Sequence, residues 1–234
     1  MKFIEGIPAS LSSDEMLIEV IFNTKDLTKN TIALERKLNG YYAMNLHPFM
    51  NLIQPNRINE VIDQYFVQNS DKNAKVLKRE FINEDPSLFG VKPFVVKFDI
   101  SSDYFVEKKG DKYLFKLGDL IGPQMEMQQE KKRILPLEAE FNRSYYRTIK
   151  IHIPEGYQIS NLEDIIIKNS YTTKDKDLFI FDSYYTLEGN VLTVTADEHY
   201  RETFVEPEIF EAYRTVINSA ADFNKVTLVL EPKK

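Results

Sequence analysis

The run LFIFDSYYTLEGNVLTVTADEHY, residues 178–200, decides the fold class. Its two halves, 178–187 and 191–200, are rich in aromatic and β-branched residues, which are typical of strands. Between them stands Glu188-Gly-Asn190, and a short glycine-containing turn between two such runs favours a β-hairpin. The run therefore predicts two antiparallel strands, and it is the clearest hairpin in the sequence.

Further strands are expected on both sides of this hairpin. In the expected strand 145–154, Arg147, Ile149, Ile151 and Ile153 alternate with polar side chains, which is the period of a strand with one buried face. Residues 31–44 also alternate, and Gly40 within them predicts a bulge or a close backbone approach. The other expected strands are 16–22, 75–82, 93–101, 104–109, 112–117, 135–142, 163–170 and 226–231.

Two segments change to the helical period. In residues 57–67 the apolar side chains fall on one helical stripe, and Asn56 stands where it can cap the helix. In residues 207–222 Pro207 occupies the first position and Glu208 lies near the positive end of the helix dipole. We therefore predict helices at these two places.

The order of these elements limits the fold class and the domain organisation. Hairpins dominate and no βαβ repeat occurs, so the sequence predicts a mainly β (α+β) fold of antiparallel β-sandwich-like halves, each with about one helix. Gly122-Pro123 stands near the midpoint of the chain. We expect an N-terminal β-rich subdomain with one helix at 12–122, and a C-terminal β-sandwich-like subdomain with helix 207–222 at 123–234.

Composition and charge argue against several classes of function. The chain has 234 residues, a net charge of −6 and no cysteine, which removes thiolate nucleophiles, disulfides and thiolate metal sites. Its densest basic run, Lys131-Lys-Arg133, is too short to follow a phosphate backbone, so no nucleic-acid partner is expected. Residues 1–15 contain Glu5 and lack a signal-peptide pattern, and no window of about 18 apolar residues occurs. We therefore expect no membrane span, and either the native protein has no leader or this chain is a fragment of a longer one.

Catalytic candidates are few. His47, His152 and His199 are too far apart for local metal-ligand spacing, and no glycine-rich phosphate loop occurs, so no metal and no cofactor are expected. His47 is interpreted as a turn residue and His152 as a solvated one. Asp197 and His199 share a strand face beside Glu198, which would suit a carboxylate-based hydrolase. The favoured interpretation is a charged strand end paired with Arg201.

Paired tyrosines supply the candidate binding residues. Tyr145-Tyr146 and Tyr184-Tyr185 lie on expected strands, as does Tyr41-Tyr42. Adjacent residues of a strand point to opposite faces, so one member of each pair can join the core while the other lies on the surface. Outward tyrosines would form a peptide- or glycan-binding face, although cross-strand packing is the ordinary role of such residues. The candidates are Tyr145, Tyr146, Tyr184 and Tyr185.

One segment near the midpoint stands out by composition. Residues 118–133, GDLIGPQMEMQQEKKR, contain two glycines, a proline and two methionines. We interpret the segment as an extended crossover between the two β-rich halves, in which Met125 and Met127 fill the junction. A functional surface at this place is the second interpretation.

Three blocks of the sequence resemble a known protein region. They are LNGYYAM (38–44), the run from YLFKLGDLIGPQMEM to IHIPEGY (113–157), and YRTVINSAADFNKVTLVLE (213–231). Together they resemble the β-rich region of unknown function that follows a transglutaminase-like domain in certain large bacterial secreted or periplasmic proteins. The resemblance covers the chain from about residue 12 to its end. The chain departs from the pattern at Gln128, where an aromatic residue, usually tyrosine, is expected.

The resemblance implies a role beside a catalytic domain. In such proteins the catalytic work is assigned to a Cys-His-Asp triad in the preceding domain, and this chain has no cysteine with which to hold it. The leading hypothesis is therefore a non-catalytic accessory module, not an enzyme, whose partner is a transglutaminase-like domain of the same protein. The resemblance also implies a periplasmic or secreted location. The alternatives are a stand-alone peptide- or glycan-binding domain and a carboxylate hydrolase at residues 197–199.

Overall fold

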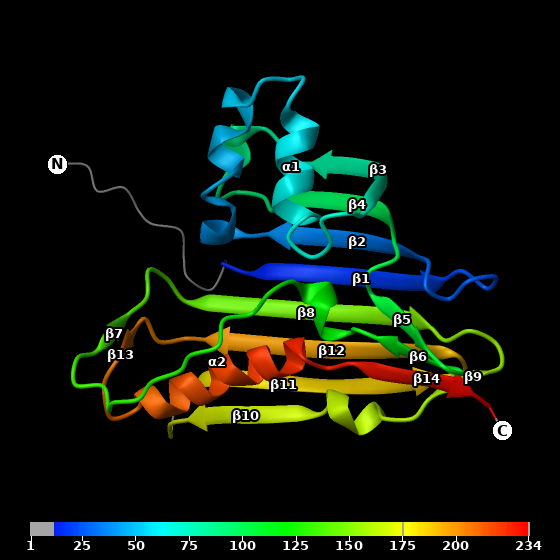
Figure 1. Ribbon diagram of the computed structural model, residues 1–234. Coiled ribbons are helices and arrows are strands. Elements are labelled where there is room, and N and C mark those ends of the chain that lie inside the picture. Colours follow the sequence, from blue (N-terminus) through cyan, green and yellow to red (C-terminus); the bar gives the residue numbers. More distant parts are fainter. Residues whose placement is uncertain (1–11, 175, 234) are drawn as a thin grey trace.

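A large sheet organises the chain in the computed structural model, which describes residues 12–174 and 176–233 (Figure 1). The sheet has eight strands in the order β10-β11-β12-β8-β1-β2-β4-β3. Their bounds are β1 (Asp14–Phe22), β2 (Asn30–Leu38), β3 (Lys75–Ile82), β4 (Phe94–Ser102), β8 (Arg143–His152), β10 (Ile167–Thr172), β11 (Asp177–Glu188) and β12 (Val191–Tyr200).

Strands from both expected subdomains meet in this sheet. β1 and β8 run parallel, with Ile18 opposite Ile149, whereas the other neighbouring strands of the sheet are antiparallel. The hairpin predicted at 178–200 is present, with Glu188 opposite Val191 at its turn. One continuous sheet thus extends across both halves of the chain, and the division at residues 122 and 123 stays a prediction.

In the described part of the chain, the remaining elements are two helices, two small sheets and several short 3-10 helices. A four-stranded sheet has the order β5-β6-β14-β9, and β13 pairs with β7. Their bounds are α1 (Ile58–Phe66), α2 (Phe210–Asn224), β5 (Val106–Lys109), β6 (Lys112–Phe115), β7 (Leu137–Glu138), β9 (Tyr157–Ile159), β13 (Phe204–Val205), β14 (Leu228–Pro232), η2 (Gly40–Ala43), η3 (His47–Leu52), η4 (Pro86–Leu88), η5 (Gly118–Ile121) and η6 (Leu162–Ile165).

Both helices and the four-stranded sheet pack on the same face of the large sheet, which we call the inner face (Figure 1). Aromatic contacts mark each junction. Phe66 of α1 lies 6.4 Å from Phe98, and Phe223 of α2 lies 6.0 Å from Phe181, measured between ring centroids. Phe22 of β1 meets Phe115 of the small sheet at 5.4 Å. The core therefore lies on the inner face, and the opposite, outer face bears the more exposed side chains of each strand.

The predicted fold class, mainly β with a few helices, is confirmed. The alternation in β8 places Arg147, Ile149 and Ile151 in the buried layer, as expected. The helix at 57–67 is present as α1, although Asn56 does not cap it; Arg57 holds the cap position without a side-chain hydrogen bond. Within the described residues no helix is long and apolar enough to span a membrane. The expected absence of a signal peptide concerns residues that lie mainly outside the described part.

Several expected boundaries are wrong. The strand expected at 31–44 ends at Leu38, because Gly40 adopts a positive φ of 55° and the chain turns into η2. The strand expected at 163–170 begins with η6, and that at 135–142 shrinks to β7. α2 begins at Phe210, after a turn, so Pro207 is not its first residue. At each place a local turn interrupts a pattern that reads as continuous.

Candidate functional site

The four tyrosines predicted to bind lie on two faces of the large sheet. Tyr146 and Tyr184 point outward, with 40% and 46% of their surface exposed. Tyr145 and Tyr185 are partly buried and pack against the core. The opposite orientation of adjacent tyrosines is thus confirmed, and an outward binding face would contain only Tyr146 and Tyr184 of these four.

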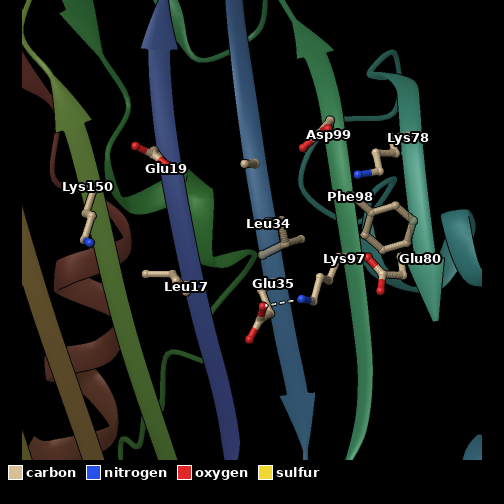
Figure 2. Close-up of a pocket in the computed structure, with 11 residues that line it drawn as sticks. Leu17, Glu19, Leu34, Glu35, Lys78, Glu80, Lys97, Phe98, Asp99 and Lys150 are labelled. Carbon is tan, nitrogen blue, oxygen red and sulfur yellow. Dashed lines mark ion pairs between the residues drawn. The ribbon is translucent and has the colours of Figure 1, made fainter. Parts of the chain in front are cut away.

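Two further exposed apolar side chains lie on the outer face. Leu17 and Ile21 of β1 are 42% and 51% exposed. Around Leu17 the surface forms a groove of about 220 Å³, which Figure 2 shows with its charged side chains. There the carboxylate of Glu35 lies 3.1 Å from Lys37 Nζ and 3.2 Å from Lys97 Nζ. Burial alone would raise the pKa of Glu35, but these two lysines lower it.

The candidate acid–base residues 197–199 are divided between the two faces. Asp197 and His199 share the outer face, as expected, whereas Glu198 points to the inner face and is 9% exposed. His199 Nδ1 lies 3.2 Å from Ser144 Oγ. The favoured pairing with Arg201 is wrong: within the described residues Arg201 forms no ion pair with either carboxylate. Arg201 lies beyond the end of β12, and its backbone N–H donates to the carbonyl oxygen of Leu178.

Burial shifts the pKa values of Asp197 and His199. It raises the pKa of Asp197, and neighbouring Asp182 raises that pKa further. Burial lowers the pKa of His199, and Arg201 lowers it further. Both shifts favour the neutral form, and Glu198 lies on the other side of the sheet. The three residues therefore do not form one site.

The other two histidines are held in the framework. His152 Nε2 lies 2.5 Å from the carboxylate of Glu19 on the outer face, so it has a partner besides solvent. His47 is fully buried in η3, with Nε2 2.9 Å from the carbonyl oxygen of Asp85. Within residues 12–174 and 176–233 no group of three acidic or histidine side chains is placed to hold a metal ion.

A cluster that the sequence did not reveal lies on the inner face. Asp14, 1% exposed, accepts from Arg36 Nε at 2.8 Å and from Arg36 Nη2 at 2.6 Å. Arg147 Nη2 donates to the same carboxylate at 3.0 Å, and its Nη1 donates to the Asp14 carbonyl oxygen at 2.6 Å. Burial alone would raise the pKa of Asp14, but the two guanidiniums outweigh burial and hold the pKa below its ordinary value. Asp14 is therefore a buried, ionised carboxylate with two cationic partners.

A third arginine extends the cluster. Arg143 Nη2 donates to the hydroxyl of Tyr213, and its guanidinium carbon lies 4.7 Å from the ring centroid of Tyr200. The hydroxyl of Tyr200 donates to Glu198 at 2.5 Å. Burial raises the pKa of Glu198, although Tyr200 and nearby Arg147 oppose the shift. Arg36, Arg143 and Arg147 thus stand with two carboxyl groups in one partly buried layer.

Two neighbouring hollows open onto this layer. One, of about 310 Å³, is lined by the three arginines, Asp14 and Glu198. The other, of about 550 Å³, is lined mainly by aromatic and apolar side chains, Tyr42 and Phe141 among them. Met125, Arg143 and Ile217 line both. Their sizes fall in the range of small-molecule sites.

Segment 118–127 passes over these hollows and is held by α2. The side chain of Asn224 donates to the carbonyl oxygens of Gly118 at 2.7 Å and Gly122 at 3.1 Å. Asn218 accepts from Met127 N at 2.8 Å and donates to Met127 O at 3.2 Å. The expectation that both methionines fill the junction is wrong for Met125, which is 66% exposed at the mouth of the hollows. Met127 packs against the core.

We expect Asn218→Ala to loosen this segment without changing the fold. The variant removes both side-chain hydrogen bonds to Met127, and together such bonds contribute about 1–3 kcal/mol. Native-state hydrogen exchange should become about tenfold faster at the Met127 amide. Exchange in β8 and β12 is the internal control and should stay unchanged, and a Met127 amide as protected as before would contradict this account.

The arginine cluster has a recognisable sequence signal. Arg36 and Arg147 both occupy positions at which the alternation of their strands places an apolar, inward side chain. An arginine in the buried register of a strand requires a buried anionic partner. That signal indicates a polar cluster without naming Asp14, which lies far from both in sequence.

The comparison with known families finds a match for one part of the chain. Residues 115–230 match a family model described as a domain of unknown function with solved structure. The chain contains a DUF3858 domain. The ends of the match meet in the structure, because Phe115 of β6 pairs with Leu228 of β14. The expected kinship with a β-rich region of unknown function is thus confirmed for just under half of the chain. No curated protein and no solved structure matches the chain.

The DUF3858 domain contains part of each candidate site. Arg143, Arg147 and Glu198 lie within the match, whereas Asp14 and Arg36 precede it. The buried cluster therefore joins the DUF3858 domain to the strands before it.

Proposed function

We propose that this chain is a non-catalytic accessory module that binds a transglutaminase-like domain of the same protein through its outer face, in the periplasm or outside the cell. The observation that carries the proposal is a set of four exposed apolar side chains on that face: Leu17, Ile21, Tyr146 and Tyr184. The resemblance of the sequence supports the choice of partner. The DUF3858 match supports an assignment to a domain without a known activity.

The chemistry of the outer face suits a protein partner. An antiparallel sheet can leave one face in water, and such a face is then normally polar. Here apolar side chains lie among ion pairs such as Glu35–Lys97 and His152–Glu19. Tyrosine is enriched in protein interfaces, and polar and charged side chains surround their apolar parts.

The non-catalytic part of the proposal rests on two facts. The chain has no cysteine to act as the nucleophile of a transglutaminase-like triad. In addition, Glu198 is separated by the sheet from Asp197 and His199. A hydrolase built on these three side chains would need them around one substrate.

The first measurement is the size and location of the native protein, by immunoblot of fractionated source cells with an antibody to this chain. The expected result is a band far above 27.4 kDa in a periplasmic or secreted fraction. A band near 27.4 kDa would contradict the proposed partnership and favour a stand-alone binding protein.

Tyr146→Ala and Tyr184→Ala should each weaken binding of the separately expressed catalytic domain by about tenfold, because an interfacial tyrosine commonly contributes more than about 1 kcal/mol. Isothermal titration calorimetry checks this. Tyr104→Ala is the matched control, since Tyr104 is 42% exposed and lies outside the large sheet. Equal affinities for all three variants and the unchanged chain would exclude this face as the interface.

A further inference from the structure

We propose that the two joined hollows on the inner face form a binding site for a single carboxylate attached to an apolar group, with Arg143 as the residue that binds the carboxylate. This site is separate from the outer face, so the proposal does not depend on the proposed partnership. The argument rests on hydrogen bonding, charge and the shape of the two hollows.

Arg143 is the guanidinium with unused donor capacity. Its Nε is buried and has no hydrogen-bond partner among the described residues. Its known contacts are to two tyrosines, Tyr213 through Nη2 and Tyr200 through its ring face. A buried charged donor without a partner is costly, and an anion that accepts from it removes that cost. By contrast, Arg36 and Arg147 already share the carboxylate of Asp14.

Another arginine of the same hollow already binds a carboxylate through its Nε and Nη2. Arg36 holds Asp14 in a fork, with Nε on one oxygen and Nη2 on the other. A planar guanidinium matches a planar carboxylate in this way. Arg143 lines both hollows, and its buried Nε is a donor that still lacks an acceptor among the described residues.

The charge of the site favours one negative charge over two. Three arginines face two carboxyl groups, Asp14 and Glu198, so the buried layer has an excess of at least one positive charge. Glu138 and Glu140, both exposed, stand on the lining of the second hollow and repel a ligand with several negative charges. A monocarboxylate neutralises one of these positive charges, whereas a phosphate dianion would be repelled more strongly by Glu138 and Glu140.

The second hollow supplies the apolar half of the site. Tyr41, Tyr42, Tyr65 and Phe141 contribute aromatic rings, and Met127 and Ile217 contribute aliphatic surface. Phe141 packs against Tyr41 and Tyr42 at 5.3 Å each, so these rings form one wall. An aromatic or aliphatic group on the carboxylate would lie here. The C-terminal residue of a peptide and a small free aromatic acid both have this chemistry.

Calorimetry on the intact chain tests the proposal with matched ligands. N-acetylphenylalanine should bind, and N-acetylphenylalaninamide, which lacks the carboxylate, should bind at least about tenfold more weakly. Inorganic phosphate should compete poorly.

Two further acids identify the source of the natural ligand. Tighter binding of N-acetyl-Gly-Gly-Phe, which has a free C-terminus, than of 3-phenylpropionate indicates a peptide. Tighter binding of 3-phenylpropionate indicates a small free acid. Equal binding of acid and amide, effective competition by phosphate, or no binding at about 10 mM acid would overturn the proposal.

Variants locate the binding in these hollows. Arg143→Gln should weaken binding of N-acetylphenylalanine at least about tenfold, and Arg57→Gln, an exposed arginine paired with Glu60, is the matched control. Met125→Glu places a negative charge at the mouth of both hollows and should weaken binding about threefold to tenfold. Met125 is mostly exposed, so this variant tests the site even if Arg143→Gln fails to fold. If both variants fold, unchanged affinity in both would refute the location. If Arg143→Gln does not fold, unchanged affinity in Met125→Glu alone would refute it.

Discussion

Asp14→Asn should lower the free energy of unfolding by about 3–5 kcal/mol, because removing one partner of a buried ion pair leaves the other charges uncompensated. Asp14 is the shared acceptor of Arg36 and Arg147, and its side chain is 2% exposed. An asparagine keeps the size but loses the charge, and its amide nitrogen faces donors. Two guanidiniums would then remain in the inner layer beside Arg143. Urea denaturation at neutral pH measures the change.

Asp222→Asn is the matched control for this substitution. Its side chain is 63% exposed and pairs only at the surface, with Lys225 Nζ at 3.1 Å. Exposed ion pairs contribute about 0–1 kcal/mol, so this variant should stay close to the unchanged chain. Similar losses in both variants would mean that the buried network does not carry the stability assigned to it.

The pH dependence of stability gives a second measure of Asp14. Its pKa in the folded chain is lowered from 3.8, so the folded state favours the ionised form. The resulting stabilisation is fully present above the unfolded pKa and is lost as the pH falls through the lower, folded pKa. Below about pH 4 the unchanged chain should therefore lose stability more steeply than Asp14→Asn. Equal slopes in acid would contradict the pKa assigned to this residue.

Local pattern predicts the hairpins well and the pairing of distant strands poorly. The hairpin at 178–200 follows from the alternation and turn within one short run. The parallel pairing of β1 with β8 joins residues more than a hundred positions apart, and nothing in either run selects the other. The arginine cluster depends on that pairing, because it brings Asp14 beside Arg147. For the same reason the sequence analysis proposed the tyrosines, which are visible in one strand, and did not propose the cluster.

Gly118 is a single residue on which a long-range contact depends, the contact between segment 118–127 and the end of α2. The sequence marks 118–133 as unusual through its glycines and methionines, but it does not show which glycine is needed. In the structure Gly118 N donates to Val226 O at 3.1 Å, and Gly118 O accepts from Asn224 at 2.7 Å. The start of the segment over the hollows is thus fixed directly to the end of α2.

Gly118→Ala should therefore destabilise the chain by about 3 kcal/mol or more, since overpacking of a tight site forces the backbone to move. A Cβ at residue 118 would lie 2.3 Å from the carbonyl oxygens of Phe223 and Asn224. Neither oxygen can turn away as a side chain would, because both belong to the backbone at the end of α2. Thermal and urea denaturation measure the loss, and faster hydrogen exchange at residues 118–127 should accompany it.

Gly110→Ala separates this steric effect from the conformational cost of replacing a glycine. Gly110 has a φ of 66° at the β5–β6 turn, and a Cβ there meets no atom within 4 Å. An alanine at this position carries only the strain of a left-handed backbone, about 1–2 kcal/mol. The loss in Gly118→Ala should exceed the loss in Gly110→Ala. A smaller loss of stability in Gly118→Ala would mean that α2 and segment 118–127 move apart at little cost in free energy. The segment over the two hollows would then not be fixed at Gly118.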